Sequence, residues 1–246
     1  MKKRFDLKFL LIFLVITLIT LVLSLSLGAL SLPFATAENI EASSTPKITV
    51  IIDAGHGGED GGASSAGGLV EKDVNLHIAS MLNDMLEMNG ISVIMTRTDD
   101  RLLYDRSSDY HGRKKKLDLA ARLAVTSNVE NAIFVSIHMN SFTDPKYSGL
   151  QVWYSDKVEG SKALAEAIQL KNRELLQPDN TRSIKSATSA IYLLDNATVP
   201  SVLVECGFLS NPNEAERFED ESYRKRVAFV IFCAITKYIE GDLGQN

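Results

Sequence analysis

The sequence predicts a single three-layer α/β domain, in which helices flank both faces of a mostly parallel central sheet, preceded by an N-terminal membrane or signal segment. From residue 47 to residue 246, short β-branched apolar runs alternate with amphipathic stretches of helical period. This alternation is typical of a parallel sheet covered by helices. The sequence shows no internal repeat, so we expect one domain rather than a repeat array.

The first 37 residues have the pattern of an export segment. Basic residues precede an uncharged apolar run over 9–32, which is typical of a segment whose N-terminus stays inside the cell. A secretory apolar region spans roughly 7–15 residues and a membrane helix about 20, so the length favours an uncleaved anchor. Ala35-Thr36-Ala37 is also a pattern that signal peptidase could cut, and cleavage stays open. Either alternative places the remaining chain outside the membrane.

Residues 38–46 form a polar linker, and 47–246 remain as the predicted catalytic domain. This length is sufficient for one sizeable hydrophobic core. The formal net charge is −5, so the chain lacks the basic footprint of a nucleic-acid-binding protein. An acidic protein also gains no general attraction to anionic polymers. It must therefore hold its substrate through local contacts.

The elements follow one another in a regular order. Residues 48–53 form a β-branched strand, and a glycine-rich stretch leads to a helix over 71–88 that Asn89-Gly90 ends. The elements expected after it are a strand at 91–96, a polar insertion at 97–116, a helix at 117–126, strands at 132–138 and 150–154, a helix at 161–176, strands at 190–194 and 199–205, and a closing helix at 223–239.

Ionisable residues end three of these hydrophobic strands. His56 follows the first strand, His138 ends Ile133–His138, and Glu205 ends Val202–Glu205. Because the carboxyl ends of parallel strands meet at one edge of a sheet, these side chains should lie together. Glu71 opens the first helix after the glycine-rich stretch and can reach the same edge.

These four residues have the chemistry of a hydrolytic metal site. Two imidazoles and a carboxylate are the ligand set of a catalytic zinc that keeps one position open for water. Zinc lowers the pKa of that water to about 7, and a second carboxylate is then needed to carry its proton to the leaving group. Glu205 suits the second role, although spacing alone does not decide which glutamate binds and which catalyses. One zinc ion is predicted.

Three neighbouring residues are candidates for supporting roles. Asp53 could accept the second ring proton of His56 or could only cap a turn. Asn75, one helical turn beyond Glu71, could orient that carboxylate. Asn140 is placed to hydrogen-bond a substrate amide or sugar.

Other polar and sulfur-containing residues have simpler interpretations. His77 and His111 are expected to be solvated. Cys206 and Cys233 are too few for a disulfide framework, and two buried thiols are favoured over a single bridge. Strand alternation points Cys206 to the face opposite Glu205.

Four stretches together resemble the zinc-dependent N-acetylmuramoyl-L-alanine amidase family, and in order and spacing they cover about residues 47–240. They are Asp53–Gly58, Glu71–Leu76, Ser136–Ser141 and Val204–Asn211. The resemblance implies a three-layer α/β fold and hydrolysis of the amide between the N-acetylmuramic acid lactyl group and L-alanine in peptidoglycan. It implies zinc ligands at His56, Glu71 and His138, and Glu205 as catalytic acid/base. Arg97 and Arg122 match family positions that shape the domain.

A narrower resemblance is to the CwlD-type sporulation and germination amidases. It rests on the N-terminal apolar segment and on the basic insertion Arg113–Lys116, which we otherwise expect to be a solvated loop. It implies removal of stem peptides for muramic δ-lactam formation in spore cortex, a deacetylase acting on the product, a protein partner that stabilises the site, and a forespore-envelope location. The chain departs from many relatives at Ala54 and Cys206, but neither change removes a ligand.

Two alternatives from other classes are kept. A zinc peptidase acting on free or wall peptides would use the same ligands. A membrane-tethered wall-binding protein without catalysis predicts the loss of a ligand, whereas all four site residues are present.

Overall fold

The computed structural model describes residues 7–29, 48–104 and 112–241. The chain divides into two units, 1–45 and 46–246. In the first unit the described element is helix α1 (Leu7–Ala29). Within the described ranges, no helix combines the length and the apolar character that a membrane crossing requires. The predicted cleavage pattern at 35–37 and the linker at 38–46 lie outside the described residues.

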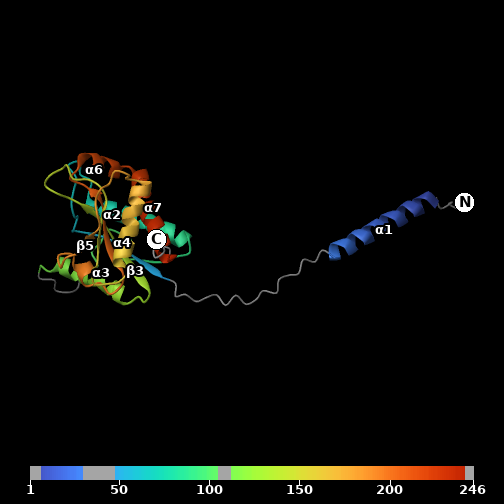
Figure 1. The fold of residues 1–246 in the computed structure, drawn as a ribbon, viewed down its shortest axis with the longest axis horizontal. Coiled ribbons are helices and arrows are strands. Elements are labelled where there is room, and N and C mark those ends of the chain that lie inside the picture. Colours follow the sequence, from blue (N-terminus) through green and yellow to red (C-terminus); the bar gives the residue numbers. More distant parts are fainter. Residues whose placement is uncertain (1–6, 30–47, 105–111, 242–246) are drawn as a thin grey trace. The chain divides into compact units, whose positions relative to one another are not determined.

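The second unit is built on a six-stranded sheet with the order β2-β1-β3-β6-β4-β5 (Figure 1). Strands β1, β2, β3 and β6 run parallel to one another, whereas β4 pairs with β6 in the antiparallel direction. The prediction of a mostly parallel sheet is confirmed. The strands are β1 (Thr49–Ala54), β2 (Ser92–Met95), β3 (Ala132–Asn140), β4 (Gln151–Tyr154), β5 (Lys185–Ser186) and β6 (Ser201–Phe208).

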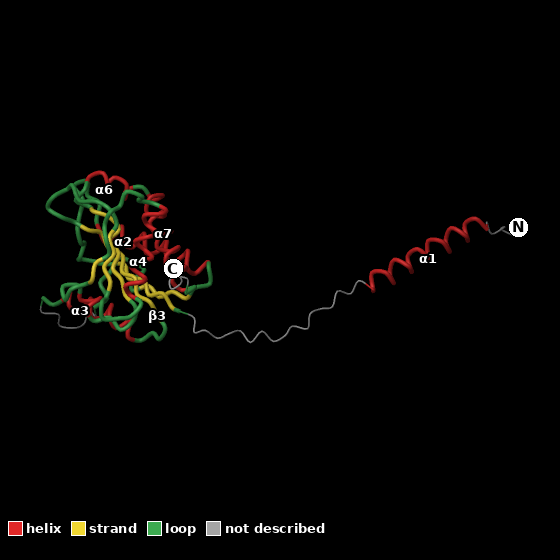
Figure 2. Tube along the Cα trace, viewed as in Figure 1, coloured by secondary structure: helices red, strands yellow, loops and turns green. Residues whose placement is uncertain are grey.

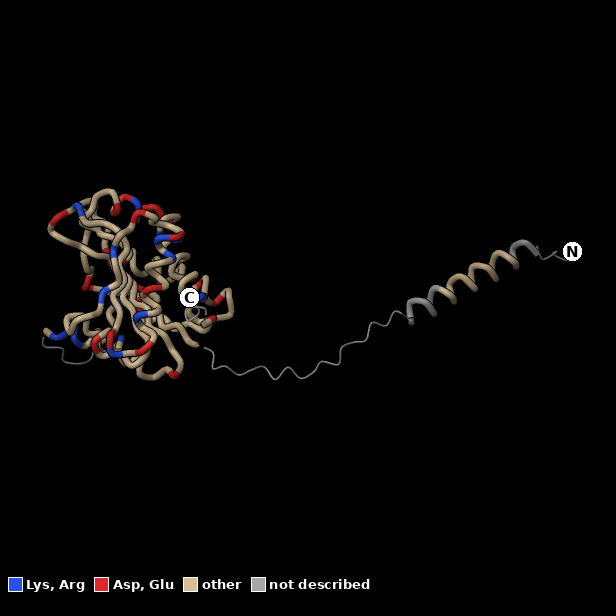
Figure 3. Tube along the Cα trace, in the orientation of Figure 1, with Lys and Arg blue, Asp and Glu red and all other residues tan. Residues whose placement is uncertain are grey.

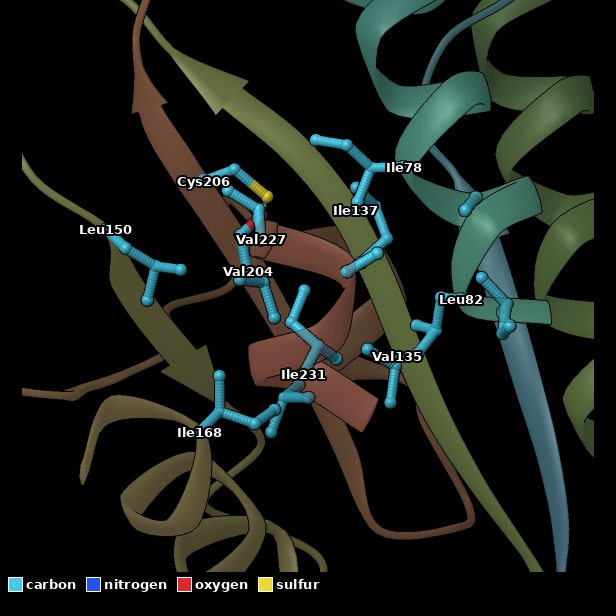
Figure 4. Packing of buried hydrophobic residues seen from close by; sticks show 14 of the residues in the cluster. Ile78, Leu82, Val135, Ile137, Leu150, Ile168, Val204, Cys206, Val227 and Ile231 are labelled. Atoms are coloured by element: carbon cyan, nitrogen blue, oxygen red, sulfur yellow. Dashed lines mark hydrogen bonds between the residues drawn. The ribbon is translucent and has the colours of Figure 1, made fainter. Parts of the chain in front are cut away.

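Helices cover both faces of the sheet, as the alternating pattern predicts (Figure 2). Helices α2 (Glu71–Met88), α4 (Ser161–Leu175) and α7 (Glu221–Ile239) pack over one face. Their buried side chains, including Ile78, Ile168 and Ile231, meet alternate residues of β3 and β6 and form the larger core (Figure 4). This face supplies most of the buried apolar area, which is the main stabilising contribution to the fold.

The opposite face has a thinner cover. Helices α3 (Lys114–Ser127) and α5 (Tyr192–Asp195) contact each other and the strands there. The smaller core on this side contains Ile51, Phe134 and Leu203. Because side chains alternate along a strand, Asp53, His138 and Glu205 face this side as well. The candidate site therefore lies on the face of the sheet that α3 and α5 cover.

Several elements differ from the sequence expectations. Strand β5 was not expected, and the expectation of a loop over Arg113–Lys116 is wrong for Lys114–Lys116, which form the first turn of α3. The predicted strand at 190–194 is wrong, because Tyr192–Asp195 forms helix α5. A short apolar run fits either structure, and here Leu193 and Leu194 pack against the sheet without joining it. Helix α6 (Pro212–Glu219) was not expected, although Asn211 caps its first turn by accepting hydrogen bonds from the backbone N–H groups of Asn213 and Glu214.

The chain order places a crevice between β1 and β3. From β1 the chain passes through α2 to β2 on one side and later through α3 to β3 on the other side. In open α/β sheets, ligands bind at such a switch point, beyond the carboxyl ends of the strands. His56 follows β1 and His138 lies near the end of β3, so both belong to this crevice.

Candidate active site

Glu71 is the centre of the candidate site. Its side chain is only 4% exposed, and its Oε1 lies 3.2 Å from Nε2 of His56 and 3.0 Å from Nδ1 of His138. One donor atom from each of the three residues lies within 4.8 Å of the others. The structure therefore brings together the predicted ligand trio from the first glycine-rich loop, α2 and β3.

The spacing of these donor atoms fits a small divalent metal ion. Metal–ligand bonds of about 2.0–2.2 Å at tetrahedral angles place neighbouring donor atoms roughly 3.3–3.6 Å apart. The two distances from Oε1 of Glu71 to the imidazole nitrogens, 3.2 Å and 3.0 Å, are only slightly shorter than this spacing between donor atoms. Small side-chain adjustments would open the trio around an ion, so these residues could hold a metal.

Backbone donors fix the carboxylate of Glu71. The N–H of Met139 donates to Oε1 at 3.0 Å, and the N–H of Ala63 donates to Oε2 at 2.7 Å. Asn75 lies 3.5 Å from Oε1 through Nδ2 and donates to the Gly55 carbonyl at 3.2 Å. Asn75 therefore links α2 to the His56 loop, and its contact with Glu71 is long.

Two buried arginines hold the loop that carries His56. Arg122 donates to the carbonyls of Ala54 (2.8 Å) and His56 (2.6 Å). Arg97 donates to the carbonyls of Ala54 (2.8 Å) and Gly55 (3.0 Å). These contacts satisfy the backbone of a loop in which His56 has a φ of 62°, a left-handed conformation that costs free energy for a side-chain-bearing residue. Arg97 and Arg122 thus shape the site without touching the ligand atoms.

The expectation that Asp53 accepts a proton from His56 is wrong. Asp53 faces into the domain and accepts hydrogen bonds from Thr96 (2.7 Å), Ser136 (2.6 Å) and Arg122 (2.7 Å). Strand direction explains this, because Asp53 and Ser136 are paired in register within the sheet, before the loop begins. Burial alone would raise the pKa of Asp53, but the charge of Arg122 and these hydrogen bonds lower it overall.

Asp60 occupies the position that the sequence interpretation gave to Asp53. Its Oδ2 lies 3.0 Å from Nδ1 of His56, and its Oδ1 accepts a hydrogen bond from the N–H of Gly62 at 3.2 Å. Among the described residues, none makes an aligned hydrogen bond to Nδ1 of His56, so its contact with Asp60 is mainly electrostatic. Burial would lower the pKa of His56, but Glu71 and Asp60 raise it overall. The i to i+4 spacing within a glycine-rich loop was a signal that could have identified Asp60.

Two glycines leave room for the ligands. A Cβ at Gly55 would lie 2.2 Å from Nε2 of His138. A Cβ at Gly62 would lie 2.5 Å from Oε2 of Glu71, and the backbone there has a φ of 68°. The glycine-rich stretch therefore allows the imidazoles and the carboxylate to pack against the backbone.

Glu205 lies beside His138 in the sheet, since the two residues are paired in register on β6 and β3. Its Oε2 is buried and has no hydrogen-bond partner among the described residues. Burial and the charge of Glu71 raise the pKa of Glu205 to about 7, against the opposite effect of the two histidines. Glu71 differs: burial would raise its pKa, but its contacts with His138 and His56 hold it far below the usual value. One carboxylate is thus a fixed anion, and the other can exchange a proton near neutral pH.

A cavity of about 260 Å³ opens over these residues. His56, His138 and Glu205 line its floor, while Lys115 and Leu119 of α3 and Ile191–Leu193 form walls. Asn140 is not among its lining residues, and its side-chain carbonyl accepts a hydrogen bond from the N–H of Ser141 at 2.8 Å. Its role in substrate binding stays a prediction.

Residues 50–237 match the family described as N-acetylmuramoyl-L-alanine amidase. The chain belongs to this amidase family. The amidase is 38% identical over 195 residues to the germination-specific N-acetylmuramoyl-L-alanine amidase of Bacillus subtilis, with 78% of this chain and 81% of the relative covered. The activity is therefore amide hydrolysis in peptidoglycan, as the four sequence stretches predicted.

Solved structures agree with the fold of the amidase. The CwlD amidase from Clostridioides difficile, in complex with the GerS lipoprotein, has a TM-score of 0.75 at 40% identity, covering 79% of this chain and 100% of that chain. The AmiC2 amidase of Nostoc punctiforme has a TM-score of 0.66 at 32% identity, covering 79% and 98%. The predicted fold class and the resemblance to the CwlD type are confirmed.

The remaining sequence interpretations concern residues away from the catalytic cavity of the amidase. His77 is exposed on α2, and His111 lies outside the described residues. Cys206 and Cys233 are both free, and Cys206 packs in the larger core on the face opposite Glu205.

Proposed function

We propose that this amidase is zinc-dependent and cleaves the amide between the lactyl group of N-acetylmuramic acid and L-alanine. The observation that carries the proposal is the buried, unpartnered Oε2 of Glu205 beside the trio of His56, Glu71 and His138. A buried carboxylate oxygen without a partner is costly, and at this place a water or a substrate group would satisfy it.

The ligands would be His56, Glu71 and His138. Their two imidazoles and one anionic carboxylate are the donor set typical of catalytic zinc. When bound, zinc would polarise the substrate carbonyl and lower the pKa of water in the site. The backbone N–H groups of Met139 and Ala63 hold the carboxylate of Glu71 in place beside the two imidazoles.

Glu205 acts as the general base and then as the general acid. Its carboxylate takes a proton from the attacking water, and the oxygen of that water forms the new bond to the carbonyl carbon of the lactyl group. The C–N bond then breaks, and Glu205 returns the proton to the departing nitrogen of L-alanine. Burial raises the pKa of Glu205 above its usual value, which favours its role as a proton carrier.

The cellular role is proposed from the relatives. One relative is named germination-specific, and the CwlD structure was solved with a lipoprotein. We infer that this chain removes stem peptides for muramic δ-lactam formation in spore cortex, upstream of a peptidoglycan deacetylase. We also infer that a protein partner stabilises its site and that the N-terminal segment, residues 1–37, exports and tethers the domain, residues 47–246, at the forespore envelope. Muropeptide profiles of spores that lack the protein test this role, because muramic δ-lactam should disappear.

The reaction is tested with purified peptidoglycan. The wild-type protein should release new amino termini that are all L-alanine, whereas a peptidase would expose internal peptide ends. Glu205→Gln should retain its metal and lose cleavage, and His138→Ala should lose both. His77→Ala, on the exposed side of α2, is the matched control and should retain both. Turnover by Glu205→Gln would contradict the assignment of this acid.

A further inference from the structure

A second cavity lies next to the catalytic cavity, at the start of α3. The second cavity has a volume of about 500 Å³ and is lined by Gly112, Arg113, Lys115, Lys116, Leu119 and Tyr192. Lys115, Leu119 and Tyr192 also line the catalytic cavity. Because they share these three residues, the two cavities are neighbours, and we call them together the α3 groove.

The α3 groove is cationic in a chain whose net charge is −5. Figure 3 shows the blue positions gathered where α3 begins. Lys114 is held by Glu59, with Nζ 2.6 Å from Oε2. Among the described contacts, Arg113, Lys115 and Lys116 make no ion pair, and Lys115 and Lys116 are exposed. Lys115 lines the catalytic cavity together with Asp60.

The location of Lys115 determines which part of the substrate its charge can contact. Lys115 lines the catalytic cavity itself, so a substrate that occupies that cavity passes its ammonium group. An extended peptide advances by about 3.5 Å per residue, so groups one or two residues from the cut bond can reach the residues that line both cavities. The peptide that leaves after cleavage begins with L-alanine and continues into a γ-linked glutamate, whose backbone carboxyl group is either free or amidated.

We propose that the α3 groove is the stem-peptide subsite and that Lys115 and Lys116 select a free carboxylate on the residue after L-alanine. Leu119 and Tyr192 supply an apolar wall for the aliphatic part of the peptide. An ammonium group attracts a carboxylate and gains little from a neutral carboxamide, so the groove discriminates by charge. This inference rests on peptidoglycan hydrolysis being the reaction of the chain.

The test uses two soluble substrates that differ only in this group. One is N-acetylmuramoyl-L-alanyl-γ-D-glutamate with its free α-carboxylate, and the other carries the α-carboxamide. The zinc-loaded wild-type protein should cleave the free acid with a KM roughly three- to tenfold lower and a similar kcat. Lys115→Gln and Lys116→Gln should reduce this ratio of KM values, and the double variant should bring it close to one.

Controls separate charge recognition from damage to the fold. Lys225→Gln, an exposed position on α7 over the opposite face of the sheet, should leave the ratio unchanged. Raising the salt concentration should reduce the wild-type preference and leave the double variant unaffected. Equilibrium binding of both substrates to Glu205→Gln, with and without Lys115→Gln, should reproduce the same ratios without turnover.

The outcomes are distinct. Equal KM values for the two substrates in the wild-type protein would overturn the subsite while leaving the amidase activity intact. Cleavage of neither substrate, with intact peptidoglycan also uncut, would overturn the activity and the subsite together. If the lysine variants instead lose only competitive inhibition by inorganic phosphate, the groove is a site for phosphate-bearing polymers and the peptide proposal is wrong.

Discussion

Oδ1 of Asp53 and Nη1 of Arg122 lie 2.7 Å apart in an ion pair whose side chains are 0% and 1% exposed. The pair joins β1 to α3, and Asp53 lies three residues before the ligand His56 in the sequence. Arg122 also donates to the carbonyl of His56 at 2.6 Å, so one guanidinium holds both the helix and the loop that carries a ligand.

Arg122→Met should be strongly destabilising. The methionine fills part of the volume but leaves the Asp53 carboxylate buried without its counter-charge. Removing one partner of a buried pair typically lowers the free energy of unfolding by roughly 3–5 kcal/mol. Denaturant unfolding measures this loss. Arg226→Met, exposed on α7, is the control, and a similar small effect of both changes would contradict the importance of the pair.

Asp53→Asn gives a pH-dependent result. The pKa of Asp53 in the folded protein lies below its ordinary 3.8, so the carboxylate contributes stability above that pH and loses it as the pH falls through the lowered value. The difference in unfolding free energy between wild type and Asp53→Asn should be constant from about pH 7 to about pH 5 and shrink below about pH 4. Urea titrations across this range check it. If this difference in unfolding free energy grew as the pH fell, the pKa of Asp53 would be raised in the folded protein and not lowered.

Gly62→Ala and Gly68→Ala form a matched pair. Both glycines have positive φ values, 68° and 90°, so each alanine should cost on the order of 1 kcal/mol through the backbone. Only at Gly62 does the new methyl group meet Oε2 of Glu71, whereas nothing lies within 4 Å of it at Gly68. Metal content after dialysis should therefore fall in Gly62→Ala and stay near wild type in Gly68→Ala. Equal metal loss would indicate a general loop defect.

Asp60→Asn should weaken metal binding without unfolding the domain. The change removes the negative charge 3.0 Å from Nδ1 of His56 and with it the support for that ring orientation. Loss of such a partner typically raises a metal dissociation constant on the order of 10-fold to 100-fold. Competition with a chelator measures it, and Asp73→Asn, exposed on α2, serves as the control. Unchanged affinity would mean that the loop backbone alone orients His56.

Sequence periodicity was sufficient for strands β1, β2, β3, β4 and β6, the main helices and the grouping of four ionisable residues at one edge. The reason is that strands buried on both faces have continuous apolar runs, and their polar ends stand out. The partner of His56 could not be obtained in this way. Asp53 is nearer to His56 in sequence, but it lies within β1 and its side chain points into the domain, whereas the loop turns Asp60 toward the ring.

Residues 190–194 show a second limit of sequence reasoning. Apolar runs of this length do not distinguish a strand from one helical turn, and only packing against Phe134 and Leu203 decides the outcome. The proposed role of Lys115 and Lys116 could not be predicted from the sequence either, because the cavity that they line also requires Tyr192, which is distant in the sequence.

The larger core and the reaction lie on opposite faces of the same sheet. Mutations over 112–119 and 190–193 that leave the Arg122 contacts intact can therefore accumulate with little effect on the apolar packing beneath α2, α4 and α7. A lineage whose wall chemistry changes could adapt its peptide preference quickly, because the residues under selection for specificity are separate from those that maintain folding.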